Sequence, residues 1–296
     1  LGYSNSFWTI PSHFSLFTGL PVGKHGVHEA PGRNTVEAVM ELGRQYRGST
    51  LAWELRKRGY ETIGISANTI VSHLSGLDRG FRQFVPYDFN YRLHLVRNGL
   101  IDLAERQEMS EANGKYRGNL VKAFIGETRQ RGLGWGLSLA SAYIRKNVVE
   151  PLVSNYITDK GAAVAISILR SLRLTEPFFL FVNLMEAHEP YYYHSKFGYS
   201  HIRCGRCIKR EFQGYLRSAR ICTRAAAEIA RLLQERGLLR RTLFVFTSDH
   251  GQELMEHGAL GHNSGHLYEE DIGIPVIVKP PDGLELAASG CYVGLH

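Results

Sequence analysis

Hydrophobic residues along the chain form short, nearly continuous runs, separated by longer stretches of mixed character. The runs are rich in β-branched and aromatic residues and are too short for typical helices, so they predict buried β-strands. The predicted strands are 61–66 (ETIGIS), 178–184 (FFLFVNL), 242–247 (TLFVFT) and, bounded by prolines, 274–279 (IPVIVK).

The stretches between these runs favour helices. Residues 50–58 end at Gly59, a common C-terminal stop, and residues 211–236 place apolar residues three and four positions apart before an Arg-Gly end. Strands that alternate with helices predict an α/β fold, with a mostly parallel sheet sandwiched by helices. We predict one domain over 1–296. Within it, the Arg-rich, Gly-punctuated residues 90–155 predict a helical insertion or lid.

The composition is that of a globular protein. Of the 296 residues, 44% are hydrophobic and 21% are charged, close to globular averages. No apolar run approaches the roughly 18 residues of a membrane-spanning helix, so a membrane-spanning protein is excluded, and so is a collagen-like one. No leader pattern is visible, which leaves localisation open with the cytoplasm as the default.

The net charge of +7 is compatible with nucleic acid, an acidic membrane surface or a small anionic substrate as a partner. Much of the excess lies in residues 203–220, where six basic residues accompany one glutamate, Glu211. Because the segment does not alternate basic residues with a series of stacking aromatic residues, it favours a solvated helix face over a nucleic-acid groove. The oligomeric state stays open.

Four cysteines are too few for a disulfide scaffold, which favours a reducing compartment. Cys204 and Cys207 form a Cys-Gly-Arg-Cys unit three residues after His201, but no second cysteine pair follows at a useful spacing. A structural zinc site needs four ligands, so zinc at this unit is disfavoured.

The first segment with candidate chemistry surrounds Thr9. Pro11 fits the first position of a helix, where its missing N–H is harmless, and Thr9 then lies just before that helix. Free backbone N–H groups and the helix dipole favour an anion there. Once a metal or base activates it, the Thr9 hydroxyl could attack a bound phosphate or sulfate ester. The alternative is that Thr9 only caps the helix, which is the preferred interpretation of this segment taken alone.

The second segment, 247–251 (TSDHG), follows a predicted strand at the carboxyl end, where open α/β sheets bind ligands. Asp249 and His250 are adjacent and can both reach a metal ion such as Zn²⁺, Mn²⁺ or a harder ion. His257, His262 and His266 follow in a Gly-rich stretch. This clustering of histidines favours a functional site over an ordinary loop.

The third segment follows the strand 178–184. His188 lies in MEAHEPY, again at the carboxyl end of a predicted strand. A single histidine here is more often structural, but its position at the same sheet edge as Asp249 favours a role in the same site.

The order of these segments resembles the sulfatase branch of the alkaline phosphatase superfamily. The resemblance covers roughly 3–86 and 160–281 and implies an alkaline-phosphatase-like α/β fold. The matching motifs are TIPSHFSLFTGLPVGKHGV at 9–27, HEPY at 188–191, RGLL at 236–239, SDHG at 248–251, EHG at 256–258, a basic residue at 262, LYEE at 267–270 and PVIV at 275–278.

The resemblance implies that Thr9 is the nucleophile and that Asp249 and His250 are metal ligands. It implies a divalent metal, namely Ca²⁺, Mg²⁺, Mn²⁺ or Zn²⁺, and a small anionic ester as substrate.

The resemblance also implies roles for three histidines. His262 matches a basic position that contacts the non-bridging oxygens of the ester, and His188 matches a histidine that assists the leaving group. His13 replaces an arginine of typical sulfatases and is expected one helical turn past Thr9, on the same face.

Two departures from the family pattern change the expected chemistry. Typical sulfatases oxidise a Cys or Ser nucleophile to formylglycine, but oxidation of the secondary alcohol of Thr9 gives a ketone, so direct attack on phosphate esters is favoured. The family's first strand, which carries further metal carboxylates, is expected upstream of Leu1. We therefore expect residues 1–296 to form a single incomplete catalytic domain that is inactive by itself.

The sequence thus predicts a metal-dependent hydrolase of sulfate or phosphate esters as the parent protein. The alternative is a catalytically degenerate family member that binds anionic ligands or polyanions through the basic segment 203–220.

Overall fold

The computed structural model describes residues 1–29, 35–86, 157, 159–192, 205–262, 265–285 and 293–294. The predicted insertion at 90–155 lies outside the described residues, as do Cys204 and the side chain of Cys207.

A three-stranded parallel sheet forms the centre of the fold. β2 (Glu61–Ser66) lies between β3 (Gln83–Pro86) and β4 (Phe178–Asn183) and pairs in parallel with both. β2 spans the predicted strand 61–66, and β4 spans the predicted strand 178–184 without its last residue. These two elements confirm the predicted parallel sheet.

The continuous apolar run of β4 is explained by burial on both sheet faces. Phe179 and Phe181 pack against one core cluster, whereas Leu180 and Val182 pack against another. Side chains alternate across a strand, so a strand covered on both faces needs apolar residues at consecutive positions.

Two other predicted strands pair antiparallel. β5 (Phe244–Thr247) pairs with β9 (Val276–Lys279). The predicted strand 274–279 is interrupted, because Pro275 has no N–H to donate to a ladder and separates β9 from β8 (Gly273–Ile274).

Short two-residue strands form two further sheets in the described part of the chain. β1 (Gly2–Tyr3) lies between β8, to which it is antiparallel, and β10 (Val293–Gly294), to which it is parallel. β6 (Glu253–Leu254) and β7 (Leu260–Gly261) form an antiparallel hairpin.

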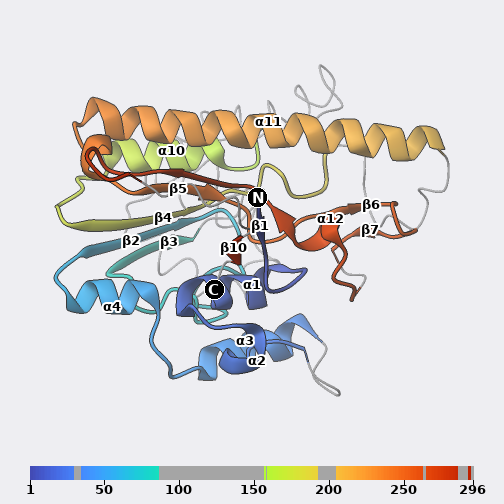
Figure 1. The fold of residues 1–296 in the computed structure, drawn as a ribbon, viewed down its shortest axis with the longest axis horizontal. Helices are drawn as coiled ribbons and strands as arrows, with labels where there is room; N and C mark the ends of the chain where they lie inside the picture. Colours follow the sequence, from blue (N-terminus) through green and yellow to red (C-terminus); the bar gives the residue numbers. More distant parts are fainter. Residues whose placement is uncertain are drawn as a thin grey trace, which may run out of the picture.

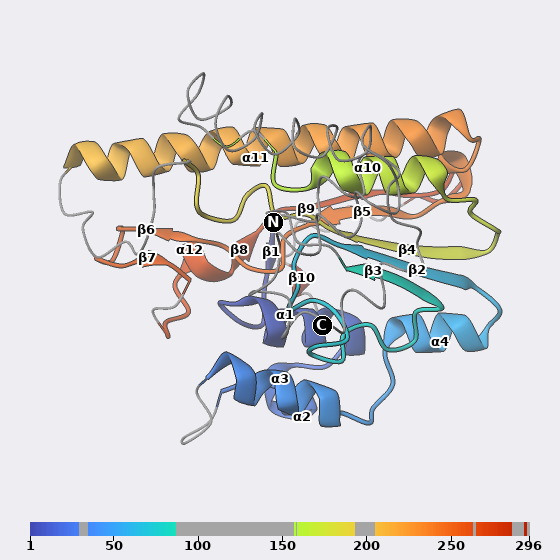
Figure 2. The same ribbon diagram turned by 180° about the vertical axis from the view of Figure 1, so that it is seen from behind.

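Helices cover both faces of the strands (Figure 1). α10 and α11 lie over one face, α1 to α4 lie over the other, and Figure 2 shows the same layers from behind. This arrangement confirms the predicted α/β sandwich. The helices are α1 (Thr9–Thr18), α2 (Val22–His25), α3 (Val36–Gln45), α4 (Leu51–Lys57), α10 (Ala162–Ser171), α11 (Gly205–Glu235) and α12 (Glu269–Ile272), with one 3₁₀ turn, η5 (Leu239–Arg241).

The ends of the helices agree with the sequence signals at most positions. The Thr50 hydroxyl accepts a hydrogen bond from the Trp53 N–H at 3.2 Å and so caps α4, and Gly59 follows with a φ of 86°. The predicted helix 50–58 is therefore confirmed. α11 begins at Gly205, six residues before the predicted start at 211, and no described helix is long and apolar enough to cross a membrane.

Each helical layer has its own core. On one side, α1 packs its apolar face against aromatic residues from the strands and the loop before β3; on the other, β2 packs against α10. The first core includes Ile10, Phe14, Phe17, Phe81 and Phe84, and the second includes Ile63, Ile65, Val164, Ala165 and Ile168.

Gly64 lies where β2 and β3 are too close for a side chain. An added Cβ would lie 2.3 Å from Cδ2 of the buried Phe84 ring, so Gly64→Ala is expected to destabilise the fold by about 1–3 kcal/mol. Urea unfolding measures the change. Gly23→Ala is the matched control, because nothing lies within 4 Å of its added Cβ, and equal stability of the two variants would contradict the packing argument.

His25 connects α2 to α1 as a neutral imidazole. The Val27 N–H donates to His25 Nδ1 at 3.0 Å, so Nε2 carries the proton and donates to the Ser15 hydroxyl at 3.1 Å. Burial, helped by His28, lowers the pKa of His25 to about 4.

This lowered pKa predicts an acid-sensitive contribution to stability. Above pH 6.5 His25 is neutral in both states; as the pH falls from 6.5 to 4, the unfolded chain binds the proton first and the folded state loses stability. The loss is expected to reach roughly 2–3 kcal/mol by pH 4. Thermal unfolding of His25→Gln and the unchanged protein between pH 7 and pH 4 tests this, since the variant should lose that much less stability.

Candidate functional site

Thr9 begins helix α1 and faces the loop after β5. The helix starts at Thr9 itself, so Pro11 occupies its third position, where the backbone nitrogen still has no intrahelical partner. The N-cap residue is Trp8, which makes no side-chain capping bond. Thr9 is therefore not the helix cap, and its buried hydroxyl lies 3.4 Å from His250 Nε2.

Asp249 and His250 lie on a tight loop that is held by backbone hydrogen bonds. The Gly251 N–H donates to Asp271 O at 2.6 Å and the Gln252 N–H to Glu270 O at 2.7 Å, which fixes the loop against α12. A Cβ at position 251 would lie 2.0 Å from Glu270 O, so this approach requires glycine.

Asp249 lies between two imidazoles. Its Oδ2 atom is 3.5 Å from His13 Nδ1 and 3.5 Å from His250 Nε2. His13 lies one turn past Thr9, as predicted, and donates Nδ1–H to Thr9 O at 2.8 Å. Burial lowers the pKa of His13 more than Asp249 raises it. Burial also raises the pKa of Asp249, but His250 and His13 together outweigh it, so the carboxylate is ionised at neutral pH.

The donor atoms around Asp249 are spaced like the ligands of one metal ion. Thr9 Oγ1, His250 Nε2 and Asp249 Oδ2 follow one another at 3.4 and 3.5 Å, and ligands about 2.0–2.2 Å from a tetrahedral Zn²⁺ lie roughly 3.3–3.6 Å apart. His250 Nδ1 donates to Gly251 O at 2.8 Å, which leaves the lone pair of the neutral ring on Nε2. The predicted ligands Asp249 and His250 therefore fit a divalent cation.

His188 and His262 extend the site beyond His250. The ring centroids of His250 and His262 are 4.5 Å apart, and those of His262 and His188 are 5.1 Å apart. His188 lies in the loop after β4, and His262 directly follows β7, so the β6–β7 hairpin places it. The structure thus brings all six predicted site residues into one cluster: Thr9, His13, His188, Asp249, His250 and His262.

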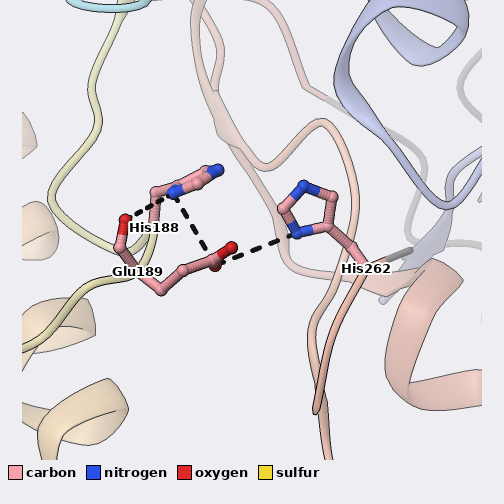
Figure 3. Close-up of side chains that lie close together, drawn as sticks. All are labelled: His188, Glu189 and His262. Carbon is pink, nitrogen blue, oxygen red and sulfur yellow. Dashed lines mark hydrogen bonds and ion pairs between the residues drawn. The ribbon is translucent and has the colours of Figure 1, made fainter. Parts of the chain in front are cut away.

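Glu189 joins the two outer histidines (Figure 3). Its Oε2 atom is 3.6 Å from His188 Nδ1 and 3.9 Å from His262 Nδ1. Gln252 donates from Nε2 to the same oxygen at 3.1 Å and accepts from His262 Nδ1 at 3.2 Å. Sequence reasoning missed both Glu189 and Gln252, although each lies within two residues of a predicted site residue, in HEP and DHGQ.

A buried lysine fixes the loop that carries His188. Lys160 Nζ donates to Glu186 O at 3.1 Å and also to His188 O. In return, Glu186 Oε1 accepts from the backbone N–H groups of Lys160 and Ala162 at 3.0 and 2.7 Å. Burial lowers the pKa of Lys160 to about 8. This reciprocal set of bonds ties the start of α10 to the site.

Two of the clustered histidines belong to a different group. His257 stacks on Tyr268 with ring centroids 3.6 Å apart and lies 3.2 Å from Glu270, and the His266 ring lies 5.2 Å from the same tyrosine. The predicted histidine cluster therefore divides, with His250 and His262 in the site and these two at an exposed surface.

One comparison with known proteins identifies a family, and another finds similar folds among solved structures. The family model described as sulfatase matches residues 2–288, and no curated protein matches the chain. The phosphonate monoester hydrolase of Agrobacterium radiobacter is similar at 17% identity and a TM-score of 0.51, over 95% of this chain and 60% of that chain. Ps i-CgsB, in complex with k-i-k-neocarrahexaose, is similar at 15% identity and a TM-score of 0.47, over 95% of this chain and 57% of that chain.

The chain thus spans 57–60% of the length of these solved structures. At such identities, the likeness to the phosphonate monoester hydrolase describes the fold alone.

Proposed function

Because this chain belongs to the sulfatase family, we propose that it is part of a metal-dependent hydrolase of sulfate- or phosphate-type esters in which Thr9 is the nucleophile. The observation that carries the proposal is the 3.4 Å separation of Thr9 Oγ1 from His250 Nε2, beside the Asp249 carboxylate. A hydroxyl next to a metal-binding carboxylate and imidazole is the arrangement that ester cleavage by a covalent intermediate requires.

Asp249, His250 and Thr9 would hold the divalent cation. When bound, the cation lowers the pKa of the nucleophile and offsets the charge of the ester. His13 is neutral and buried; it donates to Thr9 O in the first turn of α1 and lies beside the Asp249 carboxylate. These two contacts fix the position of the Thr9 hydroxyl relative to that carboxylate.

The His262 ring contacts both the His250 ring, which is next to Thr9, and the His188 ring, so His188 reaches Thr9 only through the other two histidines. An in-line attack places the leaving group opposite the nucleophile, which supports His188 beside the leaving oxygen and His262 beside the non-bridging oxygens. The Thr9 hydroxyl gives up its proton as Oγ1 bonds to the central atom, the bond to the alcohol oxygen breaks, and the alcohol leaves with a proton. Water then cleaves the bond between Thr9 Oγ1 and the central atom, which releases the acid and restores the hydroxyl.

The side chain of Thr9 favours phosphate-type esters over sulfates. Its secondary alcohol cannot become the aldehyde on which formylglycine chemistry depends, so direct attack and a phospho-threonine intermediate are the consistent route. Phosphate diesters and phosphonate monoesters are therefore the substrate classes we place first.

The proposal is tested by assaying the full-length protein on aryl phosphate diesters, aryl phosphonate monoesters and aryl sulfates, each with Mn²⁺, Zn²⁺ or Ca²⁺. Hydrolysis of either phosphorus ester above that of the sulfate is expected. Failure on all three classes would overturn the enzymatic proposal. Heparin binding that weakens steeply with salt would then favour the polyanion-binding alternative.

A further inference from the structure

We propose that Ser4 is a positioning residue, whose buried hydroxyl holds the loop of Asp249 against the helix that begins at Thr9. This inference rests on the proposed function and adds to it a residue that touches neither the ester nor the cation. Ser4 lies between β1 and α1, and in Figures 1 and 2 the chain runs from β1, beside α12, into α1. The Ser4 N–H donates to Ile272 O, at the end of α12, at 2.8 Å. Ser4 is therefore fixed where these elements meet.

The Ser4 hydroxyl joins groups from distant parts of the chain. Its Oγ atom lies 2.5 Å from Asp249 O, 2.9 Å from Ser12 Oγ and 2.8 Å from Ser6 O. All three serines are buried, so their hydrogen bonds are shielded from competing water. Because Ser12 lies three residues after Thr9 in α1, these contacts connect the nucleophile helix to the loop that carries the proposed metal ligands.

The two serine hydroxyls provide two hydrogen atoms for this cluster. The separation of Ser4 Oγ from Asp249 O is the shortest, which assigns the Ser4 hydrogen to that carbonyl. Ser4 Oγ then accepts the Ser6 N–H at 3.3 Å, and the Ser12 hydroxyl donates either to Ser4 Oγ or to Ser6 O at 3.1 Å. A hydroxyl that accepts hydrogen bonds while it donates is polarised, which strengthens its bond to Asp249 O.

This bond differs from the other contacts between α1 and the Asp249 loop. The contact of Thr9 with His250 joins two groups that would hold the cation, and the contact of His13 with Asp249 involves the carboxylate itself. A bound cation would compete for those same lone pairs. Ser4 instead binds the backbone carbonyl of Asp249 and leaves the carboxylate free for a ligand. Its bond therefore holds the loop in place both before and after the cation binds.

The affinity for Mn²⁺ is the direct test, measured by calorimetric titration of the full-length protein beside the kinetics of ester hydrolysis. Ser4→Ala removes the donor to Asp249 O, so the carboxylate is held less firmly and the Mn²⁺ affinity is expected to fall about 10- to 100-fold. Because Ser4 does not touch the ester, kcat should fall more than KM rises. Ser4→Thr restores a hydroxyl and should recover most of the affinity and most of kcat.

Ser75→Ala is the matched control, because it removes another buried hydroxyl that donates to two backbone carbonyls. Ser75 Oγ lies in the loop after β2, 2.5 Å from Ile70 O and 3.2 Å from Ser72 O. The control should lose thermal stability much as Ser4→Ala does but keep the Mn²⁺ affinity of the unchanged protein. Equal losses of Mn²⁺ affinity in the two variants would show a general effect on stability and overturn the inference.

Ser12→Ala covers the case in which Ser4→Ala does not fold. It removes one donor to the cluster but keeps the bond from Ser4 to Asp249 O, so it should weaken Mn²⁺ binding in the same direction by a smaller factor. Unchanged Mn²⁺ affinity in folded Ser4→Ala, or in Ser12→Ala where Ser4→Ala does not fold, would overturn the inference.

The same measurements separate this inference from the proposed function. Weaker Mn²⁺ binding in Ser4→Ala, with no hydrolysis by the unchanged protein, would overturn only the proposed function. Hydrolysis by the unchanged protein, with full Mn²⁺ affinity in Ser4→Ala, would overturn only this inference. An unchanged protein that binds no Mn²⁺, Zn²⁺ or Ca²⁺ would overturn both.

Discussion

Replacing Thr9 by valine is expected to lower ester hydrolysis at least about 10³-fold, because the variant lacks the atom that bonds to the ester. Valine keeps the β-branched shape at a buried position where the Thr9 hydroxyl has His250 as its side-chain partner. The fold should therefore survive, and the loss should appear in kcat more than in KM. Steady-state kinetics together with thermal unfolding of the same preparation measure both.

Two further variants make this result specific. Thr9→Ser keeps a hydroxyl at the same atom and should retain measurable turnover. Thr18→Val removes a hydroxyl from the other end of α1, where it donates to Phe14 O at 2.6 Å, and should leave the kinetics unchanged. If Thr9→Val and Thr18→Val had equal activity, the nucleophile would have to be another group.

Replacing Asp249 by asparagine is expected to lower the affinity for the divalent cation and kcat/KM by at least about 10²-fold each. The change removes one charge at nearly constant volume and keeps an oxygen for the His250 N–H, which Asp249 Oδ1 accepts at 3.1 Å. Calorimetric titration with Mn²⁺ measures the affinity, and a large excess of Mn²⁺ should restore part of the activity.

The control is Asp282→Asn, which changes an exposed carboxylate that pairs with Arg240 at 2.7 Å. Its metal affinity and kinetics should equal those of the unchanged protein. An Asp249→Asn variant that binds Mn²⁺ normally would show that the cation is held elsewhere.

Local sequence patterns predicted the elements that are determined by residues near one another in the chain. The run in β4 is apolar because both sheet faces are covered, and the cap and stop residues of α4 act within one turn. The pairing of β5 with β9 was beyond such patterns, since the direction of a neighbouring strand depends on connections far away in the chain. The family resemblance, read from ordered motifs, is confirmed by the sulfatase match over residues 2–288.

The site was predictable to the extent that motifs mark it. Residues in the family motifs, such as Thr9 and Asp249, converge as expected. Lys160 and Glu186 do not belong to such a motif, and charged residues are usually exposed. Only the folded structure shows that the Lys160 side chain is 2% exposed and contacts the loop that carries His188. Their roles became visible only through contacts.

The pairing of Thr9 with His250 also bears on how this protein is made. The two residues are separated by 241 positions, so at about 5–20 residues per second the ribosome needs roughly ten to fifty seconds to supply the second after the first. For much of that interval Phe14 and Phe17 of α1 lack the β4 residues against which they pack. The segment that forms α1 must therefore avoid aggregation until β4 and then the loop after β5 emerge. We expect chaperones to bind this segment during synthesis.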